Sequence, residues 1–459
     1  MDETEKQDDY MTAVKGFSAG KKAFINTFGC QMNEHDSETL RGMLEKMGYE
    51  KAAGYEDSDL VVFNTCCVRE SAEAKVFGHL GALKGLKHLK PNLIIALCGC
   101  MAGEPEEVKK IGKKYKNVDI IFDTKSIYLF PQLLYEKITE RGRQIFTGEG
   151  TEKIIEGLPV ERECKFKAWV TIMYGCNNFC TYCIVPYVRG RERSRRSGDI
   201  LKEITELEKE GVKEITLLGQ NVNSYGNGIE EELNFAGLLN EICLKTEIPR
   251  IRFMTSHPKD LSDELIEVMA KNPRICRHLH LPIQSGSTKI LKAMNRKYTA
   301  EEYFNLVMRV KKAMPDIVLS TDVIVGFPGE TESDFEDTLE MVRKVEFDSA
   351  YTFIYSERKG TPAAKLDGKL PDAVVKDRFD RLLELQNNIC RVKNEAMSGK
   401  VFRVLVEGLS KNDPKRYTGR TGGNKIVNFD SERDLTGEFA EIKITEAKSW
   451  SLFGEPVIL

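Results

Sequence analysis

The chain has 459 residues, 41% of them hydrophobic, and a formal net charge of −3. This length predicts two or three domains, and the near-neutral charge excludes a protein coated with basic surface, so that any nucleic-acid contact must come from local patches. No apolar run is long enough to cross a bilayer, and residues 1–20 lack the apolar segment of a secretory signal. We therefore expect a cytoplasmic protein without membrane contact, whose twelve cysteines are metal ligands or redox groups rather than disulfides.

Residues 1–20 are rich in charge and poor in aliphatic side chains, which predicts a disordered tail. From 21 to 138, short apolar runs alternate with amphipathic stretches, which predicts a parallel α/β domain. The predicted strands are 23–28, 60–63, 93–97 and 118–122. Ligands of such sheets bind beyond the carboxyl ends of the strands.

Three cysteines follow successive predicted strands of this domain, namely Cys30, Cys66 and Cys100. We predict that they converge at one edge of the sheet and hold a metal cluster. A single cysteine in such a place is more often a small buried hydrophobic residue, and this alternative weakens when three occupy equivalent positions. Cys67 and Cys98 lie next to two of these positions, and spacing alone does not decide between the neighbours.

Residues 139–161 are predicted to be a linker, because Gly, Thr and Glu accumulate there. From 162 to 394 the alternation resumes, and six β/α units predict a partial barrel whose active site gathers at the carboxyl ends of its strands. These strands are predicted at 168–173, 214–218, 250–255, 278–281, 318–325 and 349–355.

A C-x3-C-x2-C motif of Cys176, Cys180 and Cys183 follows the first barrel strand. Three thiolates on a short loop can ligate one iron–sulfur cubane and leave its fourth iron open to another ligand. Zinc and redox thiols are the competing interpretations, but zinc sites normally have a second close pair of cysteines or histidines nearby. The spacing therefore favours an open iron–sulfur cluster.

Two basic stretches predict contact with RNA. The first follows the cysteine motif and contains Arg189, Arg191, Arg193, Arg195 and Arg196. Guanidinium groups suit phosphates, although the commoner role of a charge run is a solvated or ion-paired face. The second lies within 396–459, where short alternating runs predict a small antiparallel β-barrel. Its predicted RNA contacts are Lys415, Arg416, Tyr417 and Arg420.

Four motifs occur in order along the chain: Gly29-Cys30-Gln31-Met32-Asn33, Asn64-Thr65-Cys66, Gly99-Cys100-Met101-Ala102 and Tyr174-Gly175-Cys176-Asn177. Together they resemble the methylthiotransferase family of radical S-adenosylmethionine (SAM) enzymes, and within it the MiaB-type tRNA 2-methylthioadenosine synthases. The resemblance runs from about residue 21 to the C-terminus. It implies an N-terminal methylthiotransferase domain, a central partial (β/α)6 radical SAM barrel and a C-terminal TRAM domain.

The resemblance also implies cofactors and their ligands. A radical SAM 4Fe–4S cluster is expected on Cys176, Cys180 and Cys183. An auxiliary 4Fe–4S cluster is expected on Cys30, Cys66 and Cys100, in preference to Cys67 and Cys98. The SAM contacts are expected to be Tyr182 near the adenine and the polar residues Gln220, Ser256 and Gln284. The alternative for each polar residue is that it satisfies backbone groups of its own loop.

The implied activity is transfer of a methylthio group to C2 of N6-isopentenyladenosine in tRNA. The implied partners are the tRNA anticodon stem-loop and a flavodoxin- or ferredoxin-like electron donor. Adenine C2–H has no acidic proton, so cofactors must carry the difficult step. Three alternatives stay open: the same reaction on N6-threonylcarbamoyladenosine, reaction with an aspartate of a ribosomal protein, and a non-catalytic iron–sulfur protein that binds RNA or senses redox state.

Overall fold

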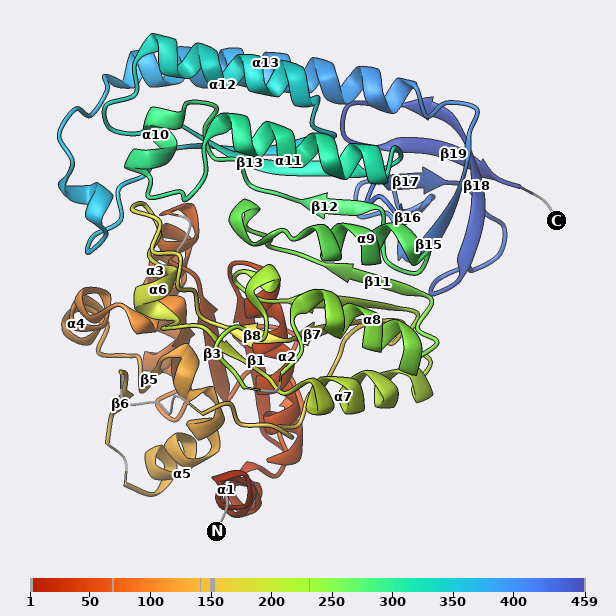
Figure 1. The fold of residues 1–459 in the computed structure, drawn as a ribbon. Coiled ribbons are helices and arrows are strands. Elements are labelled where there is room, and N and C mark those ends of the chain that lie inside the picture. Colours follow the sequence, from red (N-terminus) through yellow and green to blue (C-terminus); the bar gives the residue numbers. More distant parts are fainter. Residues whose placement is uncertain (1–2, 68–69, 141, 149–152, 231, 458–459) are drawn as a thin grey trace.

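A computed structural model describes residues 3–67, 70–140, 142–148, 153–230 and 232–457 (Figure 1). An N-terminal α/β region, a central β/α region and a C-terminal β-barrel follow one another along the chain. This confirms the predicted fold class. Part of the predicted linker, residues 141 and 149–152, lies outside the described residues. In the described ranges, no helix has the length and apolar character needed to span a membrane.

The N-terminal region is built on a six-stranded parallel sheet with the order β2-β1-β3-β4-β5-β6. Its strands are β1 (Lys22–Thr27), β2 (Glu50–Lys51), β3 (Leu60–Thr65), β4 (Ile94–Gly99), β5 (Ile120–Phe122) and β6 (Gln144–Phe146). The connecting helices are α2 (Gln31–Lys46), α3 (Glu70–Leu89), η1 (Cys100–Gly103), α4 (Pro105–Lys114), η2 (Thr124–Leu129) and α5 (Phe130–Glu140). Leu60 and Val62 belong to one apolar cluster, and Val61 and Phe63 to another. Since successive side chains of a strand point to opposite faces, both faces of this sheet are buried.

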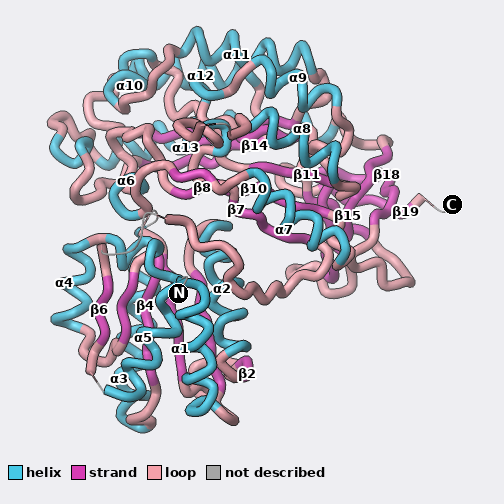
Figure 2. The backbone as a smooth tube through the Cα atoms, turned by 60° about the horizontal axis from the view of Figure 1, so that its bottom comes forward, coloured by secondary structure: helices cyan, strands magenta, loops and turns pink. Residues whose placement is uncertain are grey.

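The prediction of a disordered tail is wrong, because Glu3–Ser18 form helix α1 (Figure 2). The helix packs beside α5, and the rings of Tyr10 and Tyr135 lie 5.6 Å apart. Met11 and Val14 are fully buried in the cluster that covers one face of the sheet. A narrow apolar stripe at helical spacing is therefore enough to dock this charged segment.

The central region contains six parallel strands in two sheets of three, with the orders β11-β10-β7 and β12-β13-β14. They are β7 (Lys167–Thr171), β10 (Glu214–Leu218), β11 (Arg250–Phe253), β12 (His278–His280), β13 (Val318–Val325) and β14 (Ser349–Ile354). The two sheets meet where Cys276 N–H binds the Ile251 carbonyl at 2.9 Å. Among the described strands β14 does not pair with β7, so the barrel stays open.

Helices cover the outside of this partial barrel (Figure 1). The described helices of the region as a whole, with the short α6 lying toward the N-terminal region instead, are α6 (Val185–Val188), α7 (Ser197–Lys209), η3 (Val222–Ser224), α8 (Phe235–Lys245), η4 (Pro258–Asp260), α9 (Asp263–Lys271), α10 (Thr288–Ala293), α11 (Ala300–Ala313), α12 (Glu332–Val345), η5 (Pro362–Lys365) and α13 (Asp372–Glu395). A short pair of strands, β8 (Met173–Tyr174) and β9 (Arg193–Ser194), flanks the cysteine motif.

The C-terminal barrel is closed, with the strand order β15-β16-β17-β19-β18. Its strands are β15 (Val401–Leu409), β16 (Tyr417–Thr421), β17 (Ile426–Phe429), β18 (Phe439–Ala447) and β19 (Leu452–Pro456). The β17–β19 pair is parallel and the other pairs are antiparallel. Arg250, the first residue of β11, donates to the carbonyls of Arg420 at 2.9 Å and Arg403 at 3.0 Å. The small barrel therefore docks at the amino end of this strand of the central region.

Candidate functional site

The first cysteine trio lies on one loop at the carboxyl end of β7. Cys176 and Cys180 are buried, and Cys183 N–H closes a tight turn onto the Cys180 carbonyl at 2.9 Å. Phe179, inside this loop, has a left-handed φ of 47°. Asn295 supports that conformation, because its Nδ2 donates to the Phe179 carbonyl at 2.9 Å.

The entrance of the loop requires glycine. Gly175 has a φ of +75°, and a Cβ added there would lie 2.0 Å from the Arg191 carbonyl oxygen. The next residue, Cys176, donates its N–H to the Gly190 carbonyl at 3.1 Å. Gly190 and Arg191, which follow the cysteine motif in sequence, thus pack against Gly175 and Cys176 at its start.

Arg296 contacts this trio, and no local sequence signal indicated it. Its Nη1 lies 3.5 Å from Cys180 Sγ, and its Nη2 donates to the Pro282 carbonyl at 2.7 Å. Burial raises the pKa of Cys176 to about 11 and that of Cys183 to about 12. Without metal these two thiols hold their protons at neutral pH, so cluster binding must release them.

The second trio is assembled from three loops. Cys30, Cys66 and Cys100 follow β1, β3 and β4, which are adjacent strands of one parallel sheet. Cys30 is exposed, whereas Cys66 and Cys100 are buried. The structure therefore brings all three to the predicted edge. In the described residues, no three Cys, His, Asp or Glu side chains are placed so that together they could hold a single metal ion.

Asn33 ties the loops of the second trio together. Its Nδ2 donates to the carbonyls of Phe28 at 3.0 Å and Thr65 at 2.9 Å, just before Cys30 and Cys66. Glycine allows the close approach: a Cβ on Gly29 would lie 2.8 Å from Cys66 Cβ, and one on Gly99 would lie 2.3 Å from the Thr65 carbonyl oxygen.

The neighbouring cysteines are placed differently from each other. Cys98 is fully buried in an apolar cluster on one face of the sheet, and burial raises its thiol pKa. Its side chain therefore packs into this cluster, although the charges of Asp36 and Cys100 still act on it. Cys67 packs with Cys100, Ile184 and Val188. A hydrogen bond with Cys67 and the charge of Arg189 lower the pKa of Cys100, while the same hydrogen bond raises the pKa of Cys67.

Arg189 does not belong to an RNA-binding surface, which corrects the sequence prediction. The residue is 4% exposed, and its Nε donates to Cys100 Sγ at 3.2 Å. Its Nη2 donates to Asn33 Oδ1 at 3.0 Å and pairs with Asp36 Oδ2 at 3.1 Å. A residue from the loop of the first trio thus enters the second trio. Ile184, next to Cys183, and Val188 pack with Cys100, so the segment around α6 connects the loop of the first trio to the second trio.

Arg195 is likewise wrong as a predicted RNA contact. It is 8% exposed and pairs with Glu156 and Glu203, both at 2.7 Å. Arg191 and Arg196 are exposed, the former over the ring of Phe179 and the latter 3.8 Å from Glu232. Arg193 is partly buried, with its guanidinium over the Tyr174 ring. Only some of the arginine run is therefore on the surface.

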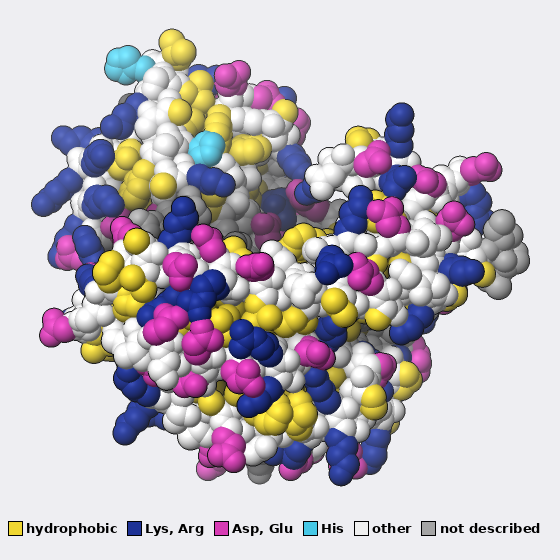
Figure 3. Space-filling view, turned by 90° about the horizontal axis from the view of Figure 1, so that it is seen from above, with side chains coloured by type: hydrophobic (Ala, Val, Ile, Leu, Met, Phe, Trp, Pro, Cys, Tyr) yellow, Lys and Arg dark blue, Asp and Glu magenta, His cyan; other side chains and the backbone are white. Residues whose placement is uncertain are grey.

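Charges of both signs mix on the face seen in Figure 3, without one continuous basic field. In the C-terminal barrel, Lys415 is exposed, while Arg416 pairs with Asp413 at 3.5 Å and Arg420 with Glu407 at 3.3 Å. The ring of Tyr417 stacks on Phe429, with centroids 6.1 Å apart, and packs against the barrel core. Lys415 is thus the freest of the four predicted barrel contacts to meet a phosphate.

Two predicted SAM contacts have polar atoms that need a partner. Ser256 Oγ and Gln220 Oε1 are buried and accept or donate no hydrogen bond within the described chain. They follow the neighbouring strands β11 and β10, at the carboxyl ends where the first trio also lies. Buried polar atoms normally have partners, so these two atoms are available to a polar ligand at the barrel mouth.

The other two predicted SAM contacts are more constrained. Gln284 has a left-handed φ of 72°, and its backbone bonds to Asp322 and Ile324 on β13, both at 2.9 Å. Tyr182 packs against an apolar cluster that includes Phe327. The backbone of Gln284 is therefore fixed against β13, and Tyr182, within the cysteine loop, is held by apolar packing.

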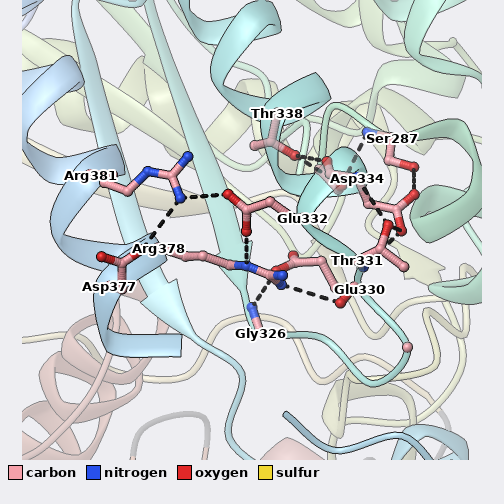
Figure 4. Close-up of polar contacts among 12 residues, drawn as sticks. Ser287, Gly326, Glu330, Thr331, Glu332, Asp334, Thr338, Asp377, Arg378 and Arg381 are labelled. Carbon is pink, nitrogen blue, oxygen red and sulfur yellow. Dashed lines mark hydrogen bonds and ion pairs between the residues drawn. The ribbon is translucent and has the colours of Figure 1, made fainter. Parts of the chain in front are cut away.

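The loop that follows β13 is held by a polar network (Figure 4). Glu330 accepts a hydrogen bond from Arg378 Nη1 of α13 at 2.7 Å. Thr331 and Asp334 form a capping box at the start of α12, and Ser287 Oγ donates to Asp334 Oδ1 at 2.7 Å. Loops after two neighbouring strands are thereby fastened to the outer helices, which fixes the mouth of the barrel.

Three family descriptions match the chain: the radical SAM superfamily over residues 170–342, the uncharacterized protein family UPF0004 over 22–123 and the TRAM domain over 395–457. A structure of the radical SAM methyltransferase TsrM from Kitasatospora setae, with cobalamin and a 4Fe–4S cluster bound, is similar over 75% of this chain and 77% of that chain. The TM-score is 0.54 at 15% identity, which shows a shared fold. The chain is thus a radical SAM protein with a TRAM domain, a class whose cofactors are an iron–sulfur cluster and SAM.

Full-length relatives define the family more closely. The tRNA-2-methylthio-N(6)-dimethylallyladenosine synthase of Acetivibrio thermocellus is 56% identical over 98% of this chain and 94% of its own length. The synthase of the same name from Alkaliphilus oremlandii is 52% identical over 99% of this chain and 97% of its own. The chain belongs to this family of tRNA-2-methylthio-N(6)-dimethylallyladenosine synthases. The resemblance read from the motifs is confirmed.

Proposed function

We propose that the protein transfers a methylthio group to C2 of N6-isopentenyladenosine beside the anticodon of tRNA. The observation that carries this proposal is the full-length identity of 56% and 52% to synthases named for that product. Those names favour the dimethylallyl substrate over threonylcarbamoyladenosine. The connection of the two cysteine trios through the segment around α6 supports it, because radical formation and sulfur supply are separate tasks.

In this proposal Cys176, Cys180 and Cys183 hold a 4Fe–4S cluster that leaves one iron for SAM. Cys30, Cys66 and Cys100 hold a second 4Fe–4S cluster. When bound, these groups supply one-electron chemistry that activates an inert C–H bond, and the sulfur that is inserted. The glycines beside each trio allow the loops that carry the cysteines to approach one another closely.

The protein's own side chains bind and orient the other reactants. Gln220 and Ser256 offer their unpartnered polar atoms to SAM, while Gln284 and Tyr182 line the same mouth. Arg191, Arg193 and Arg196 face the anticodon loop from the cluster side, with the target base turned out of the stack. The contacts of the C-terminal barrel are Lys415, Arg416, Tyr417 and Arg420. A flavodoxin- or ferredoxin-like protein supplies electrons.

Mass spectrometry of tRNA nucleosides from cells lacking the protein tests this function. We expect the methylthio nucleoside to disappear and N6-isopentenyladenosine to accumulate, with rescue by the wild-type gene and no rescue by a Cys176→Ala variant. An unchanged nucleoside profile would refute the proposal, and loss of the methylthiolated threonylcarbamoyl nucleoside instead would assign the other substrate. Anaerobically reconstituted protein should carry about eight irons, corresponding to two cubanes.

A further inference from the structure

Arg189 occupies the junction between the two cysteine trios. It ends α6, where its backbone N–H binds the Val185 carbonyl at 2.8 Å. Its side chain, however, is buried in the N-terminal region against Cys100, Asn33 and Asp36. The backbone of Arg189 therefore belongs to the segment that follows the first trio, and its charge lies beside Cys100 of the second.

The orientation of this guanidinium is fixed by its polar partners. Asp36 and Asn33 both bind Nη2, which leaves Nε directed at Cys100 Sγ. Asn33 also binds the backbone just before Cys30 and Cys66, so one network links Arg189 to all three loops of the second trio. A planar fork with fixed donors suits this task better than the flexible ammonium of lysine.

A buried cation with an N–H donor on a cluster sulfur has a defined electrostatic effect. A cluster that accepts one electron gains one negative charge, so a neighbouring positive charge and a hydrogen bond to sulfur stabilise the reduced form. The effect is strong where water is excluded. Asp36 offsets part of the charge, but the hydrogen bond to Cys100 remains.

We propose that Arg189 is a positioning residue that orients Cys100 and raises the reduction potential of the auxiliary cluster. The inference rests on the proposed function, because it requires a cluster on Cys30, Cys66 and Cys100. It gives one member of the arginine run a role in the protein interior rather than on RNA.

The test uses the full chain with Cys176, Cys180 and Cys183 changed to alanine, so that iron binds to the second trio alone. After anaerobic reconstitution, iron content and the midpoint potential are measured by redox titration with electron paramagnetic resonance. In this background Arg189→Gln should keep about four irons. At a fixed potential, its ratio of reduced to oxidised cluster should fall about tenfold, which is about 59 mV for a one-electron couple.

Two further variants make the result decisive. Arg378→Gln removes an equally buried, ion-paired arginine on α13 and should leave the potential unchanged. Arg189→Lys keeps the charge but loses the fork, and should lower the potential by less than Arg189→Gln does. If Arg189→Gln binds no iron, the test rests on Arg189→Lys, whose auxiliary cluster must have a lower potential than the cluster in the background that retains Arg189.

An unshifted potential in the Arg189 variants, or a wild-type auxiliary cluster that titanium(III) citrate does not reduce, would overturn the inference. A different failure refutes the proposed function instead: no iron at all in the background that retains Arg189. Iron content therefore separates the two failures.

Discussion

The two cysteine trios lie on either side of α6 but are built differently. Cys176, Cys180 and Cys183 share a single loop, whose shape depends on nearby backbone such as Gly175 and Phe179. The second trio is collected from the ends of three strands, and its geometry depends on the packing of a whole parallel sheet. A local site is visible in the sequence and sensitive to local change. An assembled site depends on contacts between segments distant in the sequence.

Removing one ligand from each trio should separate their functions. Cys176→Ala should abolish both SAM cleavage and methylthiolation, to the uncatalysed level, a loss of about 10⁶-fold or more. Cys30→Ala should retain 5′-deoxyadenosine formation and lose only the methylthio product. Both products are measured by liquid chromatography with mass spectrometry. Cys164→Ala, at a cysteine outside both trios, serves as control, and loss of SAM cleavage in Cys30→Ala would contradict the division.

Glycine substitutions should damage each trio by its own route. Gly175→Ala should lose the iron of the first trio, because its new Cβ collides with the Arg191 carbonyl. Gly99→Ala should lose the iron of the second trio, because its new Cβ collides with the Thr65 carbonyl. Left-handed backbone and these clashes cost about 1–3 kcal/mol or more. Iron content of the reconstituted protein should fall from about eight to about four in each case.

The matched control is Gly85→Ala in α3, where an added Cβ meets nothing within 4 Å. Alanine in a helix interior should stabilise the protein by about 0.5–1 kcal/mol. Iron loss in Gly85→Ala equal to that in the other two variants would show that the loss does not come from the two clashes.

A pair of asparagine variants sharpens the comparison. Asn33→Ala removes the bonds that join the loops of the second trio, and Asn295→Ala removes the support of Phe179 in the first. Each buried group left without a partner costs about 1–3 kcal/mol. We expect Asn33→Ala to lower auxiliary iron and Asn295→Ala to lower only the iron of the first trio, measured in backgrounds that retain one trio. The reverse pattern would contradict this assignment.

Acid should lower the stability of the contact between α2 of the N-terminal region and β7 of the central region. His35 of α2 is buried, with Nδ1 3.2 Å from Thr171 Oγ1 of β7, and burial lowers its pKa to about 4. The unfolded chain, with a pKa of about 6.5, binds a proton between these values that the folded chain does not. The contribution of neutral His35 to the free energy of unfolding is therefore complete above pH 6.5. It falls as the pH drops toward 4, and the loss down to pH 5 is about 2 kcal/mol.

His35→Gln should flatten this part of the pH dependence, measured as the free energy of unfolding at pH 7 and pH 5. His88→Gln, at an exposed position in α3, should leave the dependence as it is in the wild type. An identical loss of stability in His35→Gln and wild type would show that other groups carry the acid sensitivity.

Much of the fold and both trios could be predicted from sequence. The C-x3-C-x2-C motif is local, and the rule that parallel strands present their carboxyl ends at one edge placed Cys30, Cys66 and Cys100 together. Helix α1 was missed because its apolar stripe is narrow and lies among charged residues. A segment of that composition reveals its structure only when the surface that receives it is known.

The arginines show why the rest was not predictable. Arg189 and Arg195 have the local sequence of a solvated charge run, but their partners Asp36, Glu156 and Glu203 lie elsewhere in the chain. Arg296 reaches Cys180 from a segment with no motif. Burial of a charge depends on tertiary partners, and sequence spacing carries no record of them.

The joint between β11 and the C-terminal barrel has an evolutionary consequence. Arg250 and Arg252 bind main-chain carbonyls of the barrel, those of Arg403, Arg420 and Gly422 among them. Every amino acid carries that carbonyl, so these hydrogen bonds tolerate side-chain changes at Arg403, Arg420 and Gly422, whereas the Glu407–Lys167 ion pair at 2.6 Å depends on side chains. The barrel can therefore diverge in what its outer loops recognise while the main-chain part of its attachment to the central region is kept.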